Sequence, residues 1–558
     1  MEELNLSRRK LITSASAAGL AIAGTGALFI SQSGPSALAQ DTNDTGGGQA
    51  TPVALGDPVP PEFSVATNWP VENYNLAATR APGETKISSE TIGQLGLGWT
   101  FEPPPGSSAF GILTANPIVA GDTVFVQDAL ANTYALNRTS GESIWSTTPN
   151  QQIPSGGPNG LAAAYGFIFT TEGGSADVVC LKQETGEEVW RTNIRGPLNE
   201  GITTAPMVYN SVVYVSTIPG DPEAFYGGGQ RGVIFALDAA TGGVLWYFDT
   251  TTDNLWGNPR VNSGGGFWHP PSVDADGNLY VGIGNAAPYP GTKEWPAGSS
   301  RPGDNDYANN TLKFDPVTGT LTWAHNVKPH DIFDLDNQLT PIVADLDDGR
   351  KAVFSSGKHG IVVALNRDSG EVFWQTPVGT HKNDNVSAIP EGTAIEVYPG
   401  TLGGVETPMA YANGMVFAPV YELSSWYTGS GFDPDHPFNF TTATGVIVAL
   451  NATDGTIAWQ VDMPTGPLAG ITVTNDILFT AGLDGAIIAL STSDGTKLFS
   501  YQAPAGINTS PAVSGDSIIF AAGGPLIPSA NTVNAPETPV ATVFELKLGG
   551  TPQATPTA

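Results

Sequence analysis

The chain has 558 residues, of which 68 are Gly, 45 are Pro and only 13% are charged. Many turn-forming residues and few charges favour short strands joined by tight turns over long charged helices. Acidic residues number 53 against 22 basic ones, which gives a formal net charge of -31. A surface this acidic repels phosphate backbones, so nucleic acid is excluded as an expected partner.

The first 39 residues are expected to form a targeting segment that lies outside the fold. Ser7-Arg8-Arg9-Lys10 resembles the twin-arginine export motif, a weakly hydrophobic stretch runs from Ala15 to Ile30, and Ala37-Leu38-Ala39 offers a cleavage site. A transmembrane anchor is the alternative, but Gly residues dilute the hydrophobic stretch. We therefore expect an exported protein, periplasmic or extracellular at the cell surface, with no membrane span in the mature chain.

The remaining chain is expected to form a single large body with loose ends. Residues 40–61 are a polar Gly/Thr/Pro linker and residues 549–558 a short tail, both expected to be disordered. The folded body then covers residues 62–548. Cys180 is the single cysteine, so a disulfide framework, a Cys-based metal cluster and a covalently attached haem are all excluded. Its apolar neighbours indicate a small buried side chain.

An internal repeat determines the expected architecture. Each copy consists of an apolar strand, Ala-Leu-Asp/Asn or a variant of it, a turn with Gly, and an aromatic residue four positions after that Gly. The copies begin at Ala135, Cys180, Ala236, Phe314, Ala364, Ala449 and Ala489, and they end at Trp145, Trp190, Trp246, Trp323, Trp374, Trp459 and Phe499. Such a module indicates a β-hairpin whose Gly takes the positive-φ turn position. The Trp is expected to pack between neighbouring sheets.

Seven copies leave one blade to be completed by the two ends of the chain. Trp99 lies in an isolated strand near the start, and the last strand, Ala541 to Leu546, has no Trp after it. Pairing these two strands would close the ring and remove the exposed sheet edges. The sequence thus predicts an all-β, eight-bladed β-propeller closed by its N- and C-terminal strands.

Residues suited to a binding site occur in the long segments between copies. Trp268, Asn285, Asp334, Asp336 and Lys358 all lie within about one hundred residues. Carboxylate and amide oxygens suit a hard cation such as calcium or a lanthanide, and an indole face can stack on a planar ligand. The alternative is that these Asp residues belong to solvated turns, as most D-x-D pairs do.

This region resembles the pyrroloquinoline quinone (PQQ)-dependent alcohol dehydrogenase family. The matching motifs, in the same order, are Gly264–Trp268, Gly284–Tyr289, Arg301–Asn305, His330–Asp334 and Gly357–Gly360. With the repeats, the resemblance covers essentially the whole mature chain, and it implies the quinoprotein propeller fold.

The resemblance also implies a role for each matching residue. Trp268 would stack on the quinone, Lys358 would hydrogen-bond its oxygens, and Asn285 would bind the metal. Asp334 would be both a metal ligand and the general base that takes the alcohol proton as hydride passes to the cofactor. Asp336 would be an extra ligand, as in lanthanide-using members. His330 and Asp331 are interpreted as residues that shape the loop.

Several positions depart from the family pattern, so one wall of the site matches and the other does not. The adjacent-cysteine pair is absent near Ile153–Gly157, and a family Glu is replaced by Thr114. The metal-binding Glu is also missing at its place, which leaves two possible substitutes for it. The residues concerned are Gly227 at that place, Glu223 and Glu406 as substitutes, and Leu468 where a pocket Trp is usual.

Three hypotheses follow. The first is a dehydrogenase that uses PQQ and calcium or a lanthanide to oxidise an alcohol or sugar and passes electrons to an external acceptor such as a cytochrome c. The second is a non-catalytic propeller that kept the quinoprotein scaffold as a binding or assembly module. The third is an enzyme that holds a different ligand in the central channel.

Overall fold

The structure is a computed structural model, and it describes residues 51–553 except residues 84, 107, 109, 150–156, 199, 220–227 and 533–535. The predicted targeting segment lies outside the described residues, as do residues 40–50 of the linker, residues 554–558 of the tail, Glu223 and Gly227. Within the described residues, no helix is long and apolar enough to cross a membrane.

Eight sheets of four antiparallel strands account for most of the described chain. Blade one comprises β2 (Ile118–Ala120), β3 (Thr123–Gln127), β4 (Thr133–Asn137) and β5 (Ser143–Thr147). Blade two comprises β6 (Leu161–Ala164), β7 (Phe167–Glu172), β8 (Asp177–Lys182) and β9 (Glu188–Asn193). Blade three comprises β10 (Met207–Tyr209), β11 (Val212–Ser216), β12 (Arg231–Asp238) and β13 (Val244–Asp249). Blades four and five comprise β15 (Ser272–Val273), β16 (Leu279–Gly282), β18 (Asn310–Phe314) and β19 (Leu321–Asn326); and β20 (Ile342–Asp345), β21 (Lys351–Ser355), β22 (Ile361–Asn366) and β23 (Val372–Pro377).

Blades six and seven comprise β25 (Ala410–Ala412), β26 (Met415–Glu422), β29 (Thr444–Asn451) and β30 (Ile457–Met463); and β31 (Thr472–Thr474), β32 (Ile477–Ala481), β33 (Ala486–Ser491) and β34 (Lys497–Gln502). Blade eight comprises β35 (Ala512–Ser514), β36 (Ser517–Ala522), β37 (Thr542–Leu548) and β1 (Leu95–Phe101). Smaller elements decorate this ring: β14 (Ser263–Gly265) and β17 (Ala286–Ala287) beside β12, the separate sheet β24 (Ile395–Val397), β27 (Ser425–Thr428) and β28 (Gly431–Phe432), and the short helices η1 (Pro61–Ser64), η2 (Ile92–Gln94), α2 (Asp253–Trp256) and η3 (Phe440–Thr442).

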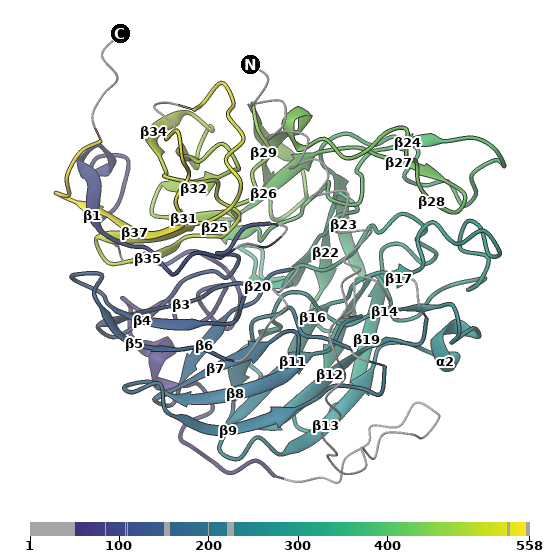
Figure 1. The fold of residues 1–558 in the computed structure, drawn as a ribbon, viewed down its shortest axis with the longest axis horizontal. Helices are drawn as coiled ribbons and strands as arrows, with labels where there is room; N and C mark the ends of the chain where they lie inside the picture. The colour runs from purple at the N-terminus through teal and green to yellow at the C-terminus, as the bar shows by residue number, and fades with distance from the viewer. Residues whose placement is uncertain are drawn as a thin grey trace.

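The predicted closure by the two ends of the chain is confirmed. Strand β1 pairs antiparallel with β37, with Leu95 opposite Leu548 and Phe101 opposite Val543. Figure 1 shows the purple β1 beside the yellow β37, so the two ends of the chain meet in one sheet, blade eight. The eight-bladed propeller expected from the repeats is therefore the observed fold, and its ring has no free sheet edge at the junction.

The repeat residues lock each blade onto its neighbour. A Cβ on Gly370 would lie 2.8 Å from the Trp323 ring, and Nε1 of Trp323 donates to the Arg367 carbonyl of the same turn. The same pairing of a Trp with the turn of the following blade recurs from Trp99 on Gly141 to Trp459 on Gly495. The Trp is thus a packing residue, as predicted, and the turn Gly is needed because its positive φ and missing side chain admit the indole.

The chain before β1 crosses the inner strands of the propeller. Trp69 forms a bridge with Val119 in blade one, and Arg80 accepts a backbone hydrogen bond from Val473 in blade seven. Between them, residues 70–79 accept backbone hydrogen bonds from the inner strands of blades two, four, five and six. We call residues 69–83 the strap. It hydrogen-bonds to the inner strands of six blades.

Segments outside the predicted body also contact the propeller. The backbone N–H of Val53 donates to Asp238, and that of Leu55 donates to Ser211, both in or beside blade three. Thr551 forms a bridge with Leu97 in β1. These residues fall in the ranges that the sequence places in a linker and a tail, and they lie against the propeller because its side chains and edge bind their backbone.

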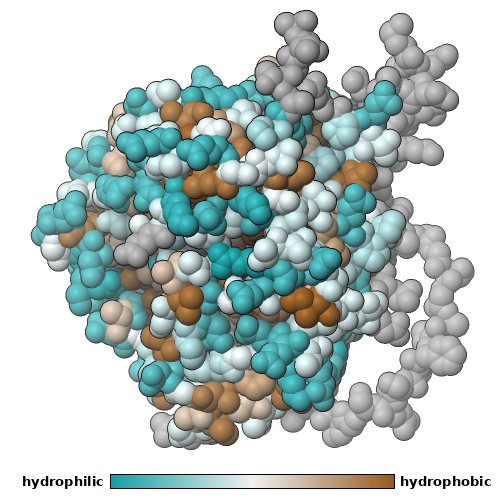
Figure 2. Space-filling model, turned by 90° about the vertical axis from the view of Figure 1, so that its left-hand side faces the viewer, coloured by the Kyte–Doolittle hydropathy of each residue, from teal (hydrophilic) through white to brown (hydrophobic). Residues whose placement is uncertain are grey.

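Cys180 is fully buried in β8, and burial raises the pKa of its thiol to about 12. It is the apolar core residue that the sequence indicates. The face that carries β1, β5 and β34 is mainly hydrophilic, with hydrophobic residues in small separate groups (Figure 2). No large apolar patch is visible on that face.

Candidate active site

The topology brings the predicted site residues to one end of the channel. Trp268 lies just before β15, and Asp334 and Asp336 lie shortly before β20, so these three residues precede the starts of inner strands. Asn285 follows β16, and Lys358 lies between β21 and β22. The second strand of each blade runs antiparallel to the first, so its end lies level with the start of the first. We call this end the channel mouth.

Lys358 joins the two Asp residues at the mouth. Its Nζ lies 3.1 Å from Oδ2 of Asp334 and 2.7 Å from Oδ2 of Asp336. The three side chains are nearly buried, with 12%, 7% and 1% of their surfaces exposed, respectively. Thr401 adds a short hydrogen bond from its hydroxyl to Oδ2 of Asp334. The structure thus brings together Asp334, Asp336 and Lys358, and it adds Thr401, which no motif in the sequence singled out.

The loop that carries Asp334 is held by its own side chains. Both carboxylate oxygens of Asp331 accept backbone hydrogen bonds, one from Phe333 at 3.0 Å and one from Leu335 at 2.8 Å. Asp334 itself has φ +65, a conformation that an Asp tolerates better than a bulky residue. The fully buried Arg301 donates to the Asp331 carbonyl at 2.7 Å. Asp331 therefore shapes the loop, as expected, and the Arg301–Asn305 motif braces it.

Trp268 lies beside the acidic pair. A Cβ on Gly284 would lie 2.8 Å from Nε1 of Trp268 and 3.5 Å from Oδ1 of Asp336, so Gly284 separates the indole from that carboxylate. The next residue, Asn285, donates its backbone N–H to Oδ1 of Asp336. The indole is only partly buried, so part of it remains accessible at the mouth. Trp268 and Asn285 thus lie at the same mouth as the Asp334–Lys358–Asp336 group.

Glu406 brings a third carboxylate to this group. Its backbone carbonyl accepts a hydrogen bond from Gln338, whose own Oε1 accepts the Lys358 backbone N–H. Oε2 of Glu406 is buried and has no hydrogen-bond partner. Burial raises the pKa of Glu406 to about 8, with Lys358 opposing and Asp336 adding to the rise. Of the two substitutes that the sequence offers for the missing Glu, Glu406 is at the mouth and Glu223 lies outside the described residues.

Burial and the neighbouring charges shift the pKa values of Asp334, Asp336 and Lys358. Burial raises the pKa of Asp334 well above its ordinary value, with Lys358 opposing and Asp336 adding to the rise, and burial likewise raises the pKa of Asp336. Burial acts to lower the pKa of Lys358, but the surrounding carboxylates outweigh it and keep that pKa well above the ordinary value. One ammonium faces three carboxylates, so the group is short of positive charge.

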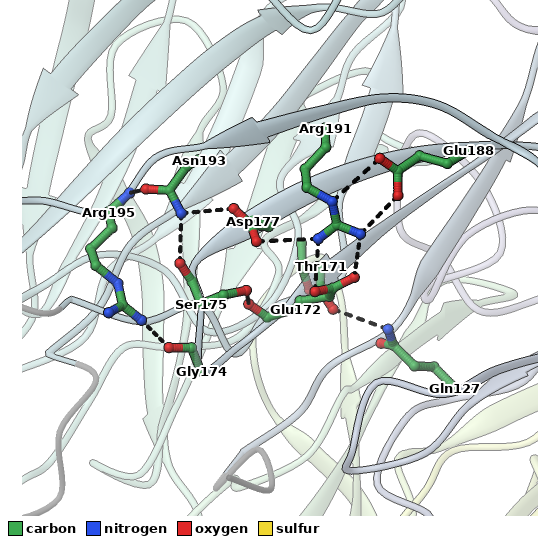
Figure 3. A network of polar contacts seen from close by, with 10 residues as sticks. All are labelled: Gln127, Thr171, Glu172, Gly174, Ser175, Asp177, Glu188, Arg191, Asn193 and Arg195. Atoms are coloured by element: carbon green, nitrogen blue, oxygen red, sulfur yellow. Dashed lines mark hydrogen bonds and ion pairs between the residues drawn. The ribbon is translucent and has the colours of Figure 1, made fainter. Parts of the chain in front are cut away.

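The far side of the mouth is built differently. Thr114, at the place of a family Glu, donates to Asn159 at 2.6 Å, and Asn159 donates to Gln127 at 2.9 Å. Gln127 donates to the Thr171 carbonyl at the edge of the cluster drawn in Figure 3. In that cluster Arg191 pairs with three carboxylates, those of Glu172, Asp177 and Glu188. The unmatched wall is thus a neutral hydrogen-bond chain that leads to a cluster in which one guanidinium pairs with three carboxylates.

Beneath Trp268 the strap contributes a pair that the sequence did not predict. Glu72, in the strap, contacts Nδ1 of His269 with its Oε1 at 2.6 Å, and both side chains are almost fully buried. Nothing in the sequence pairs these two residues, because 197 positions separate them. His359, next to Lys358, is fully buried, and burial lowers its pKa to about 3, so it is a neutral structural residue.

The donor chemistry fits a hard cation, although the ligands are not gathered around one point. Among the described residues, no three His, Cys, Asp or Glu side chains converge as a metal cluster, because Nζ of Lys358 lies between Asp334 and Asp336. The excess of carboxylates and the unpartnered oxygen of Glu406 are nevertheless what a calcium or lanthanide ion would satisfy.

Comparison with known proteins identifies the family. A family model described as the glucose/ethanol/alcohol dehydrogenase β-propeller domain, PQQ type, matches residues 195–387, which contain all five predicted site residues. A second model, described as outer membrane protein assembly factor BamB, matches residues 443–535. The quinohemoprotein alcohol dehydrogenase of Comamonas testosteroni is 25% identical over 505 residues, 77% of this chain and 68% of that protein. At about 25% identity, the chain is a distant relative of the PQQ-dependent alcohol dehydrogenases.

Other family members and solved structures agree with this assignment. The lanthanide-dependent methanol dehydrogenase of Methylacidiphilum fumariolicum is 26% identical over 65% of this chain and 66% of its own length. The solved structure of the quinohemoprotein alcohol dehydrogenase ADH-IIG of Pseudomonas putida superposes with a TM-score of 0.74, at 21% identity, over 89% of this chain and 82% of that one. A europium-containing methanol dehydrogenase superposes with a TM-score of 0.70, at 22% identity, over 87% and 99%. The PQQ-dependent dehydrogenase propeller is therefore the fold of this chain.

Proposed function

We propose that the protein is a PQQ- and metal-dependent dehydrogenase that oxidises an alcohol or a sugar. The observation that carries the proposal is the buried Asp334–Lys358–Asp336 group beside Trp268 at the channel mouth. A propeller that served only as a scaffold would gain nothing from it, because burying an acidic pair with one lysine costs desolvation energy. Such groups are typical of sites that bind or react.

Each residue has a proposed role toward the cofactor and the cation. Trp268 would offer its exposed indole face to the quinone, and Lys358 would donate hydrogen bonds to the quinone oxygens. Asn285, Asp334 and Asp336 would hold a calcium or lanthanide ion, which carboxylate and amide oxygens suit. When bound, the quinone would supply the hydride acceptor and the cation would polarise its carbonyl.

Asp334 is the proposed general base. Its Oδ2 receives hydrogen bonds from Lys358 and Thr401, which orient the carboxylate and favour its ionised form. An ionised carboxylate at this place can take the hydroxyl proton of an alcohol as hydride leaves the carbinol carbon. The Asp331 bonds to the loop backbone keep Asp334 in position for that transfer.

Electrons would leave through a separate protein. The sequence contains no C-x-x-C-H haem-attachment motif, and its one cysteine is buried in β8. We propose an external acceptor such as a cytochrome c, and export of the protein through the twin-arginine motif at residues 7–10 to a periplasmic or cell-surface location.

Reconstitution tests the dehydrogenase. Purified metal-free protein is incubated with PQQ plus calcium or lanthanum, and dye reduction is then followed with a panel of alcohols and sugars. We expect turnover with at least one metal, and we expect Asp334→Asn to lower kcat by about 10²-fold or more because the base is lost.

The controls separate this proposal from its alternatives. Asp348→Asn changes an exposed carboxylate that pairs with Arg350 and should leave turnover unchanged. No quinone absorbance and no dye reduction with either metal would contradict the dehydrogenase. That result would favour a binding or assembly module, a role to which the BamB-type match of residues 443–535 points.

A further inference from the structure

Glu406 brings a buried carboxylate oxygen without a hydrogen-bond partner to the channel mouth. Its Oε2 is buried and unpartnered, whereas Asp334 and Asp336 each bind Lys358. An unpaired buried carboxylate oxygen costs free energy unless a ligand satisfies it. The residue lies outside residues 195–387, the range matched by the alcohol dehydrogenase model.

Glu406 also faces the same charges as the acidic pair. Its carboxylate interacts electrostatically with Lys358 and with Asp336. Its backbone is tied through Gln338 to the backbone of Lys358, which holds the segment before β25 against the turn between β21 and β22. Among these four side chains, Lys358 is the only one that can carry a positive charge.

We propose that Glu406 is a ligand of the cation at the channel mouth and supplies the carboxylate that is missing before β12. The ligand would come from blade six and not from blade three, and the site would then have three carboxylates and the Asn285 amide, a set suited to calcium or a lanthanide. This inference rests on the proposed metal-dependent function.

Terbium luminescence measures binding without turnover. Metal-free, PQQ-free protein is titrated with Tb³⁺ in about 0.1 M salt, which screens the weak attraction of other surface carboxylates, and Trp is excited. Trp268 is separated from Asp336 only by Gly284, so it should sensitise a bound Tb³⁺. We expect saturable emission from the wild type. Trp268→Phe should lose most of the emission while La³⁺ competition shows unchanged affinity.

The decisive variant is Glu406→Gln, which keeps the shape and removes the charge. We expect its Kd for Tb³⁺ to rise about 10- to 100-fold, the range seen when a metal site loses a supporting group. Asp336→Asn should weaken binding similarly. The matched control is Glu396→Gln, whose carboxylate pairs with the exposed Lys382, and its Kd should equal that of the wild type.

The outcomes distinguish this inference from the proposed function. Wild-type affinity in Glu406→Gln with loss in Asp336→Asn would overturn the role of Glu406 and leave the metal site standing. Wild-type affinity in both variants would place Tb³⁺ elsewhere and overturn both. The thermal midpoint of the metal-free protein checks the fold: because Oε2 has no partner, Glu406→Gln should not lower it. A large drop would make Glu406 a structural residue and contradict the proposal. Glu406→Asp keeps the negative charge, so it should retain more Tb³⁺ binding than Glu406→Gln.

Discussion

At the scale of single residues, Lys358 partly neutralises the acidic side chains at the channel mouth. It forms ion pairs with both Asp334 and Asp336, and nearly all of its side chain is buried. Breaking a buried ion pair by removing one partner is much more costly than losing an exposed pair, because the remaining charge has no solvent around it. In the cofactor-free protein, Lys358 is therefore a stabilising residue as well as a proposed quinone contact.

Lys358→Met should lower the free energy of unfolding of the metal-free protein by about 3–5 kcal/mol. Denaturant unfolding measures it, and added calcium or lanthanum should recover part of the loss, since either cation can replace the missing charge. Lys382→Met is the control, because its pair with Glu396 is exposed and should contribute only a few tenths of a kcal/mol. Equal stability of Lys358→Met and the wild type would show that the two Asp residues are neutral in the folded protein.

At the scale of elements, seven of the eight blades are attached to the next by an indole on a glycine turn, and blade seven has Phe499 in place of the Trp. Trp374 donates its Nε1 to the Ala452 carbonyl at 2.9 Å, and the turn glycine of that repeat, Gly455, has φ +74 and lies against the ring. The outer strands carry these Trp residues, and their other positions face solvent, as in the exposed pattern of β9. The contact therefore joins the outer strand of one blade to a turn of the next.

Gly455→Ala should be markedly more destabilising than an ordinary Gly→Ala change at positive φ. Gly349→Ala is the matched control, because Gly349 has φ +85 and open space around it, so only the left-handed conformation is penalised, at about 1–2 kcal/mol. The new Cβ at Gly455 would in addition overlap the Trp374 ring, which adds about 1–3 kcal/mol. Thermal unfolding of both variants measures the difference; equal midpoints would show that the Trp moves aside at no cost.

At the scale of the whole molecule, closure has two parts. The β1–β37 pairing joins the ring at its rim, and the strap joins the inner strands across the channel. Arg80 is central to the second part. Fully buried, it donates to the Ile471 carbonyl at 2.8 Å, to Thr472 at 2.7 Å and to the Pro511 carbonyl at 3.2 Å, which ties blades seven and eight to the strap.

Arg80→Ala should destabilise the protein by about 3–5 kcal/mol, because buried carbonyls lose their donor and a large side chain is removed. Hydrogen exchange should rise first in β31 and in β35, the inner strands that Arg80 joins to the strap. Arg350→Ala, which removes an exposed partner of Asp348, should leave both quantities near those of the wild type. Unchanged exchange in these strands would show that the β1–β37 pairing alone closes the ring.

The sequence by itself determined the repeat, the number of blades and the closing strand, because a hairpin signature is local and a Trp at a regular position predicts its packing. It also identified Trp268, Asn285, Asp334, Asp336 and Lys358 as a group, through motifs with characteristic residues. Only the tertiary structure decided how they meet: that Lys358 lies between the two Asp residues, that Thr401 and Glu406 join them, and that Glu72 in the strap supports His269 below Trp268. These contacts join residues from 22 to 197 positions apart. No local pattern can specify such pairs, because the closure of the ring sets their distances.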